Sequence, residues 1–468
     1  MMNRIIDLCA HNKFMVLLFM AVAVMIGWYS LNNTKLDAIP DLSDTQVIIY
    51  SKWDRSPDIM EDQVTYPIVS ALLGLPKVKD IRGFSDFGYS YVYVIFEEGT
   101  DLYWARSRTL EYLNSILPRL PQGVQTELAK DETAVGWVYE YALVDKTGKY
   151  SLADMKSYQD WHLRYALQAV PGVAEVAPVG GFVRQYQVNI DPNKLLAYKI
   201  PIDKVVDAVG KSNNDVGARL VEFSGREYMV RGRGYIKSVG DIQQTVVATN
   251  PATGTPILIR DLGTTTLGPD LRRGVAELDG QGEVVGGVVI MRFGENAEKV
   301  IERVKATLDE LKPTLPPGLE VVPTYDRSEL IDRSIENLKG TLIEELVIVS
   351  LVILIFLLHA PSALVPIITI PLALLLSFIP MHAMGLSANI MSLGGLAIAI
   401  GAMVDAAIVM VEQTHKKLEH WEAEGQPGDY KEVIVGAVKE VGGPSFFALL
   451  VIAVSFLPVF TLEAQEGW

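Results

Sequence analysis

Residues 346–404 read LVIVSLVILIFLLHAPSALVPIITIPLALLLSFIPMHAMGLSANIMSLGGLAIAIGAMV and contain no Asp, Glu, Lys or Arg. A helix that crosses a bilayer needs about 20 mostly apolar residues, so this stretch is long enough for more than one crossing. Pro366, Pro371 and the pair Gly394 and Gly395 interrupt it. The stretch therefore predicts a helical membrane domain whose helices are joined by very short loops.

Further apolar runs on both sides extend this membrane domain. The run 14–31 is uncharged and is not followed by a small-x-small cleavage site, which favours an uncleaved anchor over a signal peptide. With the N-terminus in the cytoplasm, segment 36–338 lies outside and 414–441 inside, where Lys416 and Lys417 give a partial positive-inside signal. The odd number of spans and the abrupt end lead us to expect the N-terminal half of a longer protein. The expected spans are 14–31, 341–359, 363–382, 388–413 and 442–462.

The segment between the first two spans has the pattern of an α+β domain. A strand, a helix, two strands and a helix are expected over 47–117, the split β-α-β order of ferredoxin-like folds. LPRLPQGV at 117–124 and KPTLPPGL at 312–319 each follow an amphipathic helix and precede an expected strand. This repeat indicates two related subdomains. Residues 208–288 are rich in Gly, Thr and turn residues and predict an inserted β-rich lobe.

The expected domain organisation follows from these patterns. It is 1–35 (N-terminal segment and first span), 36–180 (first β-α-β subdomain), 181–338 (second subdomain, with the lobe at about 208–288), 339–413 (second to fourth spans), 414–441 (cytoplasmic loop) and 442–468 (fifth span and the end of the chain).

The composition excludes several classes of function. The 468-residue chain has a net charge of −15, which argues against nucleic acid as a partner, because phosphate binding needs clustered Lys and Arg. A single cysteine, Cys9, rules out an intrachain disulfide and cysteine-based zinc sites, and the six His residues lack ligand spacing. A metal would have to be bound by carboxylates or thioethers. No nucleophile–base pair, P-loop or dinucleotide motif supports an enzymatic role.

Asp405 lies deep in the predicted span 388–413, where a charge costs about 2.5–3.5 kcal/mol on insertion scales. Because ionisation is disfavoured there, such a carboxyl can take up a proton from one side and release it to the other. Glu412 follows two helical turns later, roughly 10 Å along the axis, and is either a second relay group or a snorkelling surface residue. Glu344 and Glu345 start the second span and are expected at the membrane interface.

Three methionines belong to the same predicted span: Met391, Met403 and Met410. Thioethers are soft ligands that favour Cu(I) and Ag(I) over Zn(II). Met is also a common gap-filler in apolar helices, and this second interpretation stays open from the spacing alone.

Three longer segments resemble the resistance-nodulation-division (RND) transporters, in their heavy-metal efflux branch. They are NRIIDLCAHNKFMVLL (3–18), LDAIPDLSDTQVIIYSKWDRSPDIMEDQVTYPI (36–68) and GAMVDAAIVMVEQTHK (401–416). Divalent-metal members of this branch carry the motif DFGxxxDGAxxxxEN in this span. Its second Asp matches Asp405 and its Glu matches Glu412, but its first Asp falls on Ala399. The missing carboxylate, with Met403 and Met410 around Asp405, resembles the pattern of the Cu(I)/Ag(I) exporters.

The resemblance implies a fold, a mechanism and partners. The fold class is an α-helical transmembrane bundle plus an α+β periplasmic domain, with paired ferredoxin-like subdomains and a β-rich docking lobe at 208–288. The protein would be a multi-pass homotrimer in the lipid bilayer of the bacterial inner membrane, working with a periplasmic adaptor and an outer-membrane channel. Asp405 would accept protons opposite a basic partner in the other half of the protein. The transported Cu(I) or Ag(I) would be the substrate, and no cofactor is implied.

Other functions remain open from the sequence. Export of Zn, Co or Cd is the main alternative, against which Ala399 argues. Multidrug members usually carry adjacent paired aspartates, whereas Val404 and Ala406 flank Asp405 here. A non-transporting scaffold or receptor would have no use for a buried acid and should tolerate Asp405→Asn.

Overall fold

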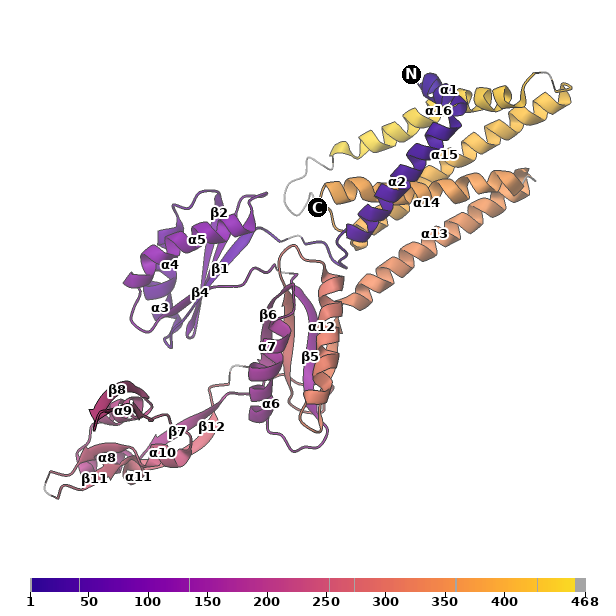
Figure 1. The fold of residues 1–468 in the computed structure, drawn as a ribbon. Helices are drawn as coiled ribbons and strands as arrows, with labels where there is room; N and C mark the ends of the chain where they lie inside the picture. Colours follow the sequence, from indigo (N-terminus) through magenta and orange to yellow (C-terminus); the bar gives the residue numbers. More distant parts are fainter. Residues whose placement is uncertain are drawn as a thin grey trace.

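The computed structural model describes residues 2–458 except Leu42, Ala134, Ala252, Arg273, Leu358, His359 and Pro427. Figure 1 shows a bundle of long helices, two subdomains that each combine a sheet with helices, and a smaller lobe at the far end from the bundle. The apolar helices and the α/β sheets agree with the predicted combination of a transmembrane bundle and an α+β domain.

The first subdomain is a four-stranded antiparallel sheet in the order β2-β3-β1-β4. Its helices lie between β1 and β2 and between β3 and β4, and they cover a core that includes Ile49, Ile68 and Leu113. Alternate β1 residues are buried, as expected for a strand with one face on a core. The elements are β1 (Gln46–Lys52), α3 (Pro57–Met60), a π-helical turn (Glu61–Thr65), α4 (Tyr66–Leu72), β2 (Val78–Asp86), β3 (Tyr89–Phe96), α5 (Leu102–Ile116), a 3-10 turn (Leu117–Arg119) and β4 (Gln125–Leu128).

The second subdomain repeats this topology with the order β14-β5-β13-β6. Its first helix also contains a π-helical turn, and its second is also followed by a 3-10 turn, so LPRLPQGV and KPTLPPGL occupy matching places. Residues 137–180 supply two strands of this sheet and the helices between them, so the expected boundary at residue 180 lies too late in the chain. The elements are β5 (Trp137–Asp145), α6 (Leu152–Tyr158), a π-helical turn (Gln159–Leu163), α7 (Arg164–Gln168), β6 (Val173–Gly180), β13 (Val285–Met291), α12 (Ala297–Leu311), a 3-10 turn (Lys312–Thr314) and β14 (Leu319–Asp326).

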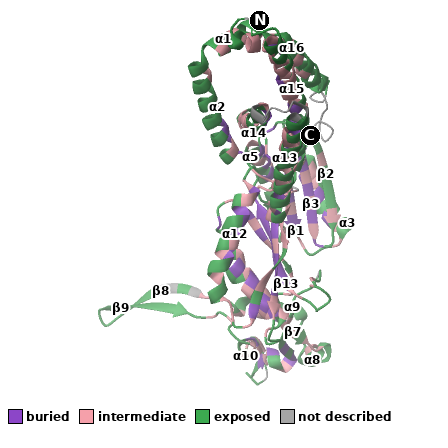
Figure 2. Cartoon of the chain, turned by 90° about the vertical axis from the view of Figure 1, so that its right-hand side faces the viewer, coloured by how far each residue is buried: buried purple, intermediate pink, exposed green. Residues whose placement is uncertain are grey.

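The lobe is inserted between β6 and β13 and joins the second subdomain through β7 and β12, which pair with each other. It therefore spans 184–269 rather than 208–288, and it contains four short helices besides its strands. The hairpin of β8 and β9 projects away from the molecule with exposed side chains (Figure 2). The elements are β7 (Arg184–Ile190), α8 (Pro192–Tyr198), α9 (Ile202–Ser212), β8 (Val216–Phe223), β9 (Arg226–Gly232), α10 (Val239–Gln243), β10 (Val246–Thr249), β11 (Pro256–Leu258), α11 (Ile259–Leu262) and β12 (Gly263–Pro269).

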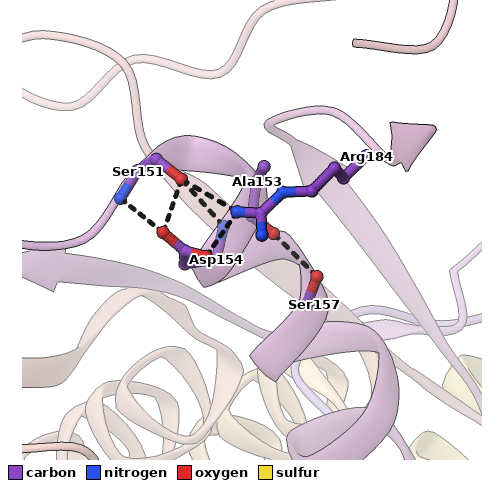
Figure 3. Close-up of polar contacts among 5 residues, drawn as sticks. All are labelled: Ser151, Ala153, Asp154, Ser157 and Arg184. Atoms are coloured by element: carbon purple, nitrogen blue, oxygen red, sulfur yellow. Dashed lines mark hydrogen bonds and ion pairs between the residues drawn. The ribbon is translucent and has the colours of Figure 1, made fainter. Parts of the chain in front are cut away.

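A polar cluster fixes the root of the lobe on α6 (Figure 3). Ser151 and Asp154 form a capping box, in which the Asp154 backbone N–H donates to Ser151 Oγ at 3.2 Å. Arg184, the first residue of β7, pairs with the Asp154 carboxylate at 2.5 Å. Hydrogen bonds from the Ser151 hydroxyl and then from the Arg184 guanidinium hold the pKa of Asp154 below its usual range.

Four helices are long and apolar enough to cross a membrane within the described residues: Lys13–Asn33, Leu364–Ala383, Ile390–Ala423 and Tyr430–Ser455. The expected span 341–359 falls in the last part of α13, and its final two residues lie outside the described part of the chain, as do 459–462 of the last expected span. The helices of this domain are α1 (Met2–His11), α2 (Lys13–Asn33), α13 (Arg327–Leu357), α14 (Ala360–Ala383), α15 (Ile390–Ala423) and α16 (Tyr430–Ser455).

Residues 414–441 are not the loop that their charge suggested. Helix α15 continues to Ala423 and α16 begins at Tyr430, so only a short connection separates them. Ion pairs one helical turn apart, such as Glu412 with Lys416, support the helical backbone in this charged stretch.

Candidate functional site

Helix α15 carries every predicted site residue, and Asn389 fixes where it begins. The Asn389 side-chain oxygen accepts hydrogen bonds from the backbone N–H groups of Met391 and Ser392, both at 3.0 Å. The Asn389 N–H in turn donates to Ser392 Oγ at 2.8 Å. These bonds satisfy donors that the first turn of a helix otherwise leaves unpaired.

One side of α15 packs against the neighbouring helices. Ile400 and Val404 are buried in a cluster with Val349 of α13 and Ile370 of α14. The side that carries Asp405 is exposed and includes the small residues Gly394 and Gly401. Small residues let a second helix approach closely in a membrane, so this surface is suited to a helix–helix contact.

Asp405 is exposed on this small-residue surface rather than buried within the bundle formed by this chain. It makes no hydrogen bond or ion pair with any residue that the structure describes. The partner expected for this acid, a basic group in the other half of the protein, stays a prediction. The carboxyl lies where a group from outside the chain could reach it.

Glu412 has a different environment two turns further along the helix. Its carboxylate pairs with Lys416 Nζ at 2.6 Å, and both side chains are about half exposed. The neighbouring Lys417 pairs with Glu440 of α16 at 3.0 Å. Glu412 thus lies in the charged end of α15, which agrees with the interfacial interpretation rather than with a relay group in the bilayer.

The three methionines occupy separate levels of α15. At 1.5 Å per residue, Met391 and Met403 are about 18 Å apart along the axis, and Met403 and Met410 about 10 Å. Met403 is half-buried against the Val349 cluster, Met410 is half-buried, and Met391 is exposed. They cannot bind one ion together, so only successive sites along the helix are compatible with this geometry.

Met391 borders a cavity of about 850 Å³ that sequence reasoning did not find. Three segments distant in sequence contribute most of its lining: 40–41 with 43–45, 96 with 98–102, and 385–387 with 389, 391 and 392. Its acidic side chains are Asp41, Asp44, Glu98 and Asp101, and Lys79 pairs with Asp44 at 3.6 Å. No group of three or more His, Cys, Asp or Glu side chains among the described residues is arranged to hold a metal ion.

The sequence placed Glu344 and Glu345 alike at the membrane interface, but their environments in the structure differ. Glu344 is exposed, as expected at an interface, but Glu345 is half-buried and its Oε2 has no partner among the described residues. The sequence could not predict this difference, because Glu344 and Glu345 are adjacent and only the rotation of α13 about its axis decides which of them is exposed.

Two α/β subdomains joined to long apolar helices, one of which carries an unpaired acid, define a membrane protein with a large α/β domain outside the bundle. The chain belongs to the AcrB/AcrD/AcrF family, whose model matches residues 5–468. This match places it in the RND superfamily, as its sequence motifs predicted.

Its relatives include cation efflux proteins. The chain is 52% identical over 473 residues to the cation efflux system protein CusA of Escherichia coli (strain K12), covering 100% of this chain and 45% of that protein. It is 51% identical over 474 residues to the putative cation efflux system protein SilA of Salmonella typhimurium, with the same coverage. It is 36% identical over 479 residues to the cobalt-zinc-cadmium resistance protein CzcA of Cupriavidus metallidurans, again with this coverage.

Solved structures give the same picture. A crystal structure of a heavy metal efflux pump matches with a TM-score of 0.85 and 31% identity, over 99% of this chain and 45% of that one. The chain thus spans about half the length of the curated relatives it matches.

Proposed function

We propose that the full-length protein exports Cu(I) and Ag(I) across the bacterial inner membrane in exchange for protons. The observation that carries this proposal is Asp405, a carboxyl without a partner among the described residues, in the apolar part of α15. A buried or lipid-facing acid is costly, and its usual role in transporters is to take up and release protons. Secondary active transport needs such a group, whereas a scaffold does not.

The small-residue surface around Asp405 supports a partner for this acid. Gly394 and Gly401 leave open space beside α15, so another helix can come close enough to place a basic group near the carboxyl. Such an ion pair would form and break as the proton moves. Glu412 remains a proposed accessory only, since Lys416 already neutralises it.

Two observations favour monovalent ions over divalent ones. Ala399 stands where divalent-metal members carry a second acid, and α15 presents three thioethers at successive levels. Soft sulfur ligands suit Cu(I) and Ag(I), which need little charge compensation compared with Zn²⁺. The higher identity to CusA (52%) than to CzcA (36%) points the same way. Met391, Met403 and Met410 would pass the ion along the helix.

The driving force is adequate for this exchange. One elementary charge that crosses 100 mV releases about 2.3 kcal/mol. At about 1.4 kcal/mol per factor of ten, this supports roughly a 40-fold gradient of metal for each proton.

The lobe supports the proposed assembly. Its β8–β9 hairpin exposes Leu220, Phe223 and Met229 far from the bundle (Figure 2). Exposed apolar side chains on an extended hairpin are suited to a contact with a neighbouring subunit. We therefore propose a homotrimer that works with a periplasmic adaptor and an outer-membrane channel.

The test compares full-length variants in a copper- and silver-sensitive bacterium. Asp405→Asn keeps the size of the side chain but cannot carry a proton, and should abolish tolerance to both ions. Glu422→Gln is the matched control, because Glu422 is an exposed acid at the charged end of the same helix. Normal tolerance in Asp405→Asn at equal expression would refute proton coupling through this residue. Protection against zinc alone would refute the monovalent assignment.

A further inference from the structure

A buried ion pair lies where the second subdomain meets the membrane domain. Strand β14 ends at Asp326 and helix α13 begins at Arg327, so the sheet continues into the membrane helix without a loop. Arg327 is only 3% exposed. Unlike the guanidinium of a surface arginine, a guanidinium buried to this extent needs partners inside the protein.

The Arg327 guanidinium connects two other parts of the chain. Its Nη2 donates to the backbone carbonyl of Trp137, the first residue of β5, at 2.6 Å. Its Nη1 lies 3.4 Å from both carboxyl oxygens of Asp37, whose side chain is 16% exposed. Burial raises the pKa of Asp37, and the Arg327 charge opposes that rise. Removing either member of such a pair would leave a buried charge without its partner.

The segment around Asp37 is also bonded to the start of α15. The Asp37 N–H donates to the Ala388 carbonyl at 3.1 Å, and the Ala388 N–H donates to the Lys35 carbonyl at 2.8 Å. The Ile390 N–H donates to the Ala38 carbonyl at 3.2 Å. Ile390 is the first residue of the helix that carries Asp405, about 22 Å further along the axis.

Apolar packing reinforces this junction. Ala38 is fully buried in the core of the second subdomain, together with Val138 and Ile331 of α13. Leu36 contacts both that core and a membrane-side cluster that includes Phe378 and Leu393. Segment 35–38 therefore cannot move with α15 without moving the core of the second subdomain.

We propose that the Asp37–Arg327 ion pair is the coupling joint that transmits movement of the Asp405 helix to the second periplasmic subdomain. The inference rests on the proposed function, since it assigns the route by which protonation in the membrane changes the periplasmic domain. Asp37 and Arg327 act as positioning residues and contact neither metal nor the transferred proton. When α15 shifts along its axis, segment 35–38 shifts with it, and the contacts of Arg327 transmit this displacement to β5 and β14.

The test uses the full-length protein in proteoliposomes with Ag(I) as the transported ion. Silver flux and the accompanying proton movement are measured per folded trimer, together with the thermal midpoint of unfolding. The variants are Asp37→Asn, Arg327→Met and the double variant. Arg333→Met is the matched control, because Arg333 forms an exposed pair with Glu329 on the same helix at 3.7 Å.

The double variant separates stability from coupling. Arg327→Met alone leaves Asp37 charged and buried, so it should unfold at a lower temperature. Neutralising both members removes that penalty and should restore the thermal midpoint. Coupling should not return: we expect the maximal rate of silver-driven proton movement to fall about tenfold, a typical size for coupling between sites. The silver concentration at half-maximal rate should stay unchanged, and Arg333→Met should behave as the wild type.

The possible results distinguish a failure of the proposed coupling from a failure of the proposed function. A double variant that is stable and transports at the wild-type rate refutes the coupling role proposed for the Asp37–Arg327 ion pair. If the double variant does not accumulate, Asp37→Asn, which keeps the bond between Arg327 and Trp137, carries the test with the same expected loss of rate. A wild type in which silver moves no protons refutes the proposed function, and the inference falls with it.

Discussion

Replacing Glu132 with Gln should stabilise the folded protein at pH 8 and leave its stability at pH 4 almost unchanged. Glu132 lies in the segment that joins β4 of the first subdomain to β5 of the second. It is half-buried, and its Oε2 has no partner among the described residues. Burial first, and then the negative charges of Glu175 and Asp131, raise the pKa of Glu132 from 4.5 to about 7.

The sign and size follow from proton linkage. A carboxyl whose pKa is higher in the folded state stabilises the fold fully below pH 4.5, and this contribution is lost as the pH rises through 7. At about 1.4 kcal/mol for each pH unit between the two pKa values, the loss would be about 3.4 kcal/mol for an enclosed group. Because Glu132 is only half-buried, solvent screening reduces the expected loss to about 1–2 kcal/mol.

Thermal unfolding of the full-length protein, followed by intrinsic fluorescence at pH 4 and pH 8, measures this loss. At roughly 2–4 °C per kcal/mol, Glu132→Gln should raise the midpoint by about 2–8 °C at pH 8 and by little at pH 4. Glu310→Gln is the control, because Glu310 is an exposed acid on α12. An equal change in midpoint at both pH values would refute the assignment of an unfavourable buried charge to Glu132.

Three further variants test packing, capping and assembly. Gly287→Ala would place a Cβ 2.5 Å from the buried Tyr141 hydroxyl and should cost about 1–3 kcal/mol, measured by denaturant unfolding. Asn389→Ala removes the cap of α15 and should cost about 1 kcal/mol, visible as faster hydrogen exchange in its first turn. Phe223→Asp on the exposed β8–β9 hairpin should weaken the trimer in light scattering without lowering the thermal midpoint of the second subdomain.

Local patterns in the sequence predicted the elements well. The charge-free run predicted the long helices, and the strand and helix order over 47–117 matches the first subdomain, because periodicity and turn residues act over neighbouring positions. The repeat of two Pro-Gly segments located the second subdomain, since each lies between a helix and a strand of the same topology.

Such local patterns could not predict which strands and side chains pair across long distances in the sequence. Strand β5 pairs with β13 and β14, about 140–190 positions later, so nothing near residue 180 revealed which sheet 137–180 joins. The lobe was placed too late for the same reason, because β7 pairs with β12 across the whole insertion. Asp37 and Arg327 are 290 positions apart, and no local pattern connects them.

The exposure of Asp405 adds to what the sequence implied about it. The sequence expects a partner in the other half of the protein but not which side of α15 faces it; the buried stripe of α15 runs through Ile400 and Val404, and Asp405 lies on the exposed side. Hydropathy reports that a residue lies at membrane depth but not which helix faces it. Because an unpaired carboxylate is unfavourable in lipid, this surface requires a further helix, and the small side chains around Asp405 set how closely that helix can approach. Ala399 therefore omits a second negative charge, and Gly401, one turn before Asp405, leaves the space through which a basic group can reach the carboxyl.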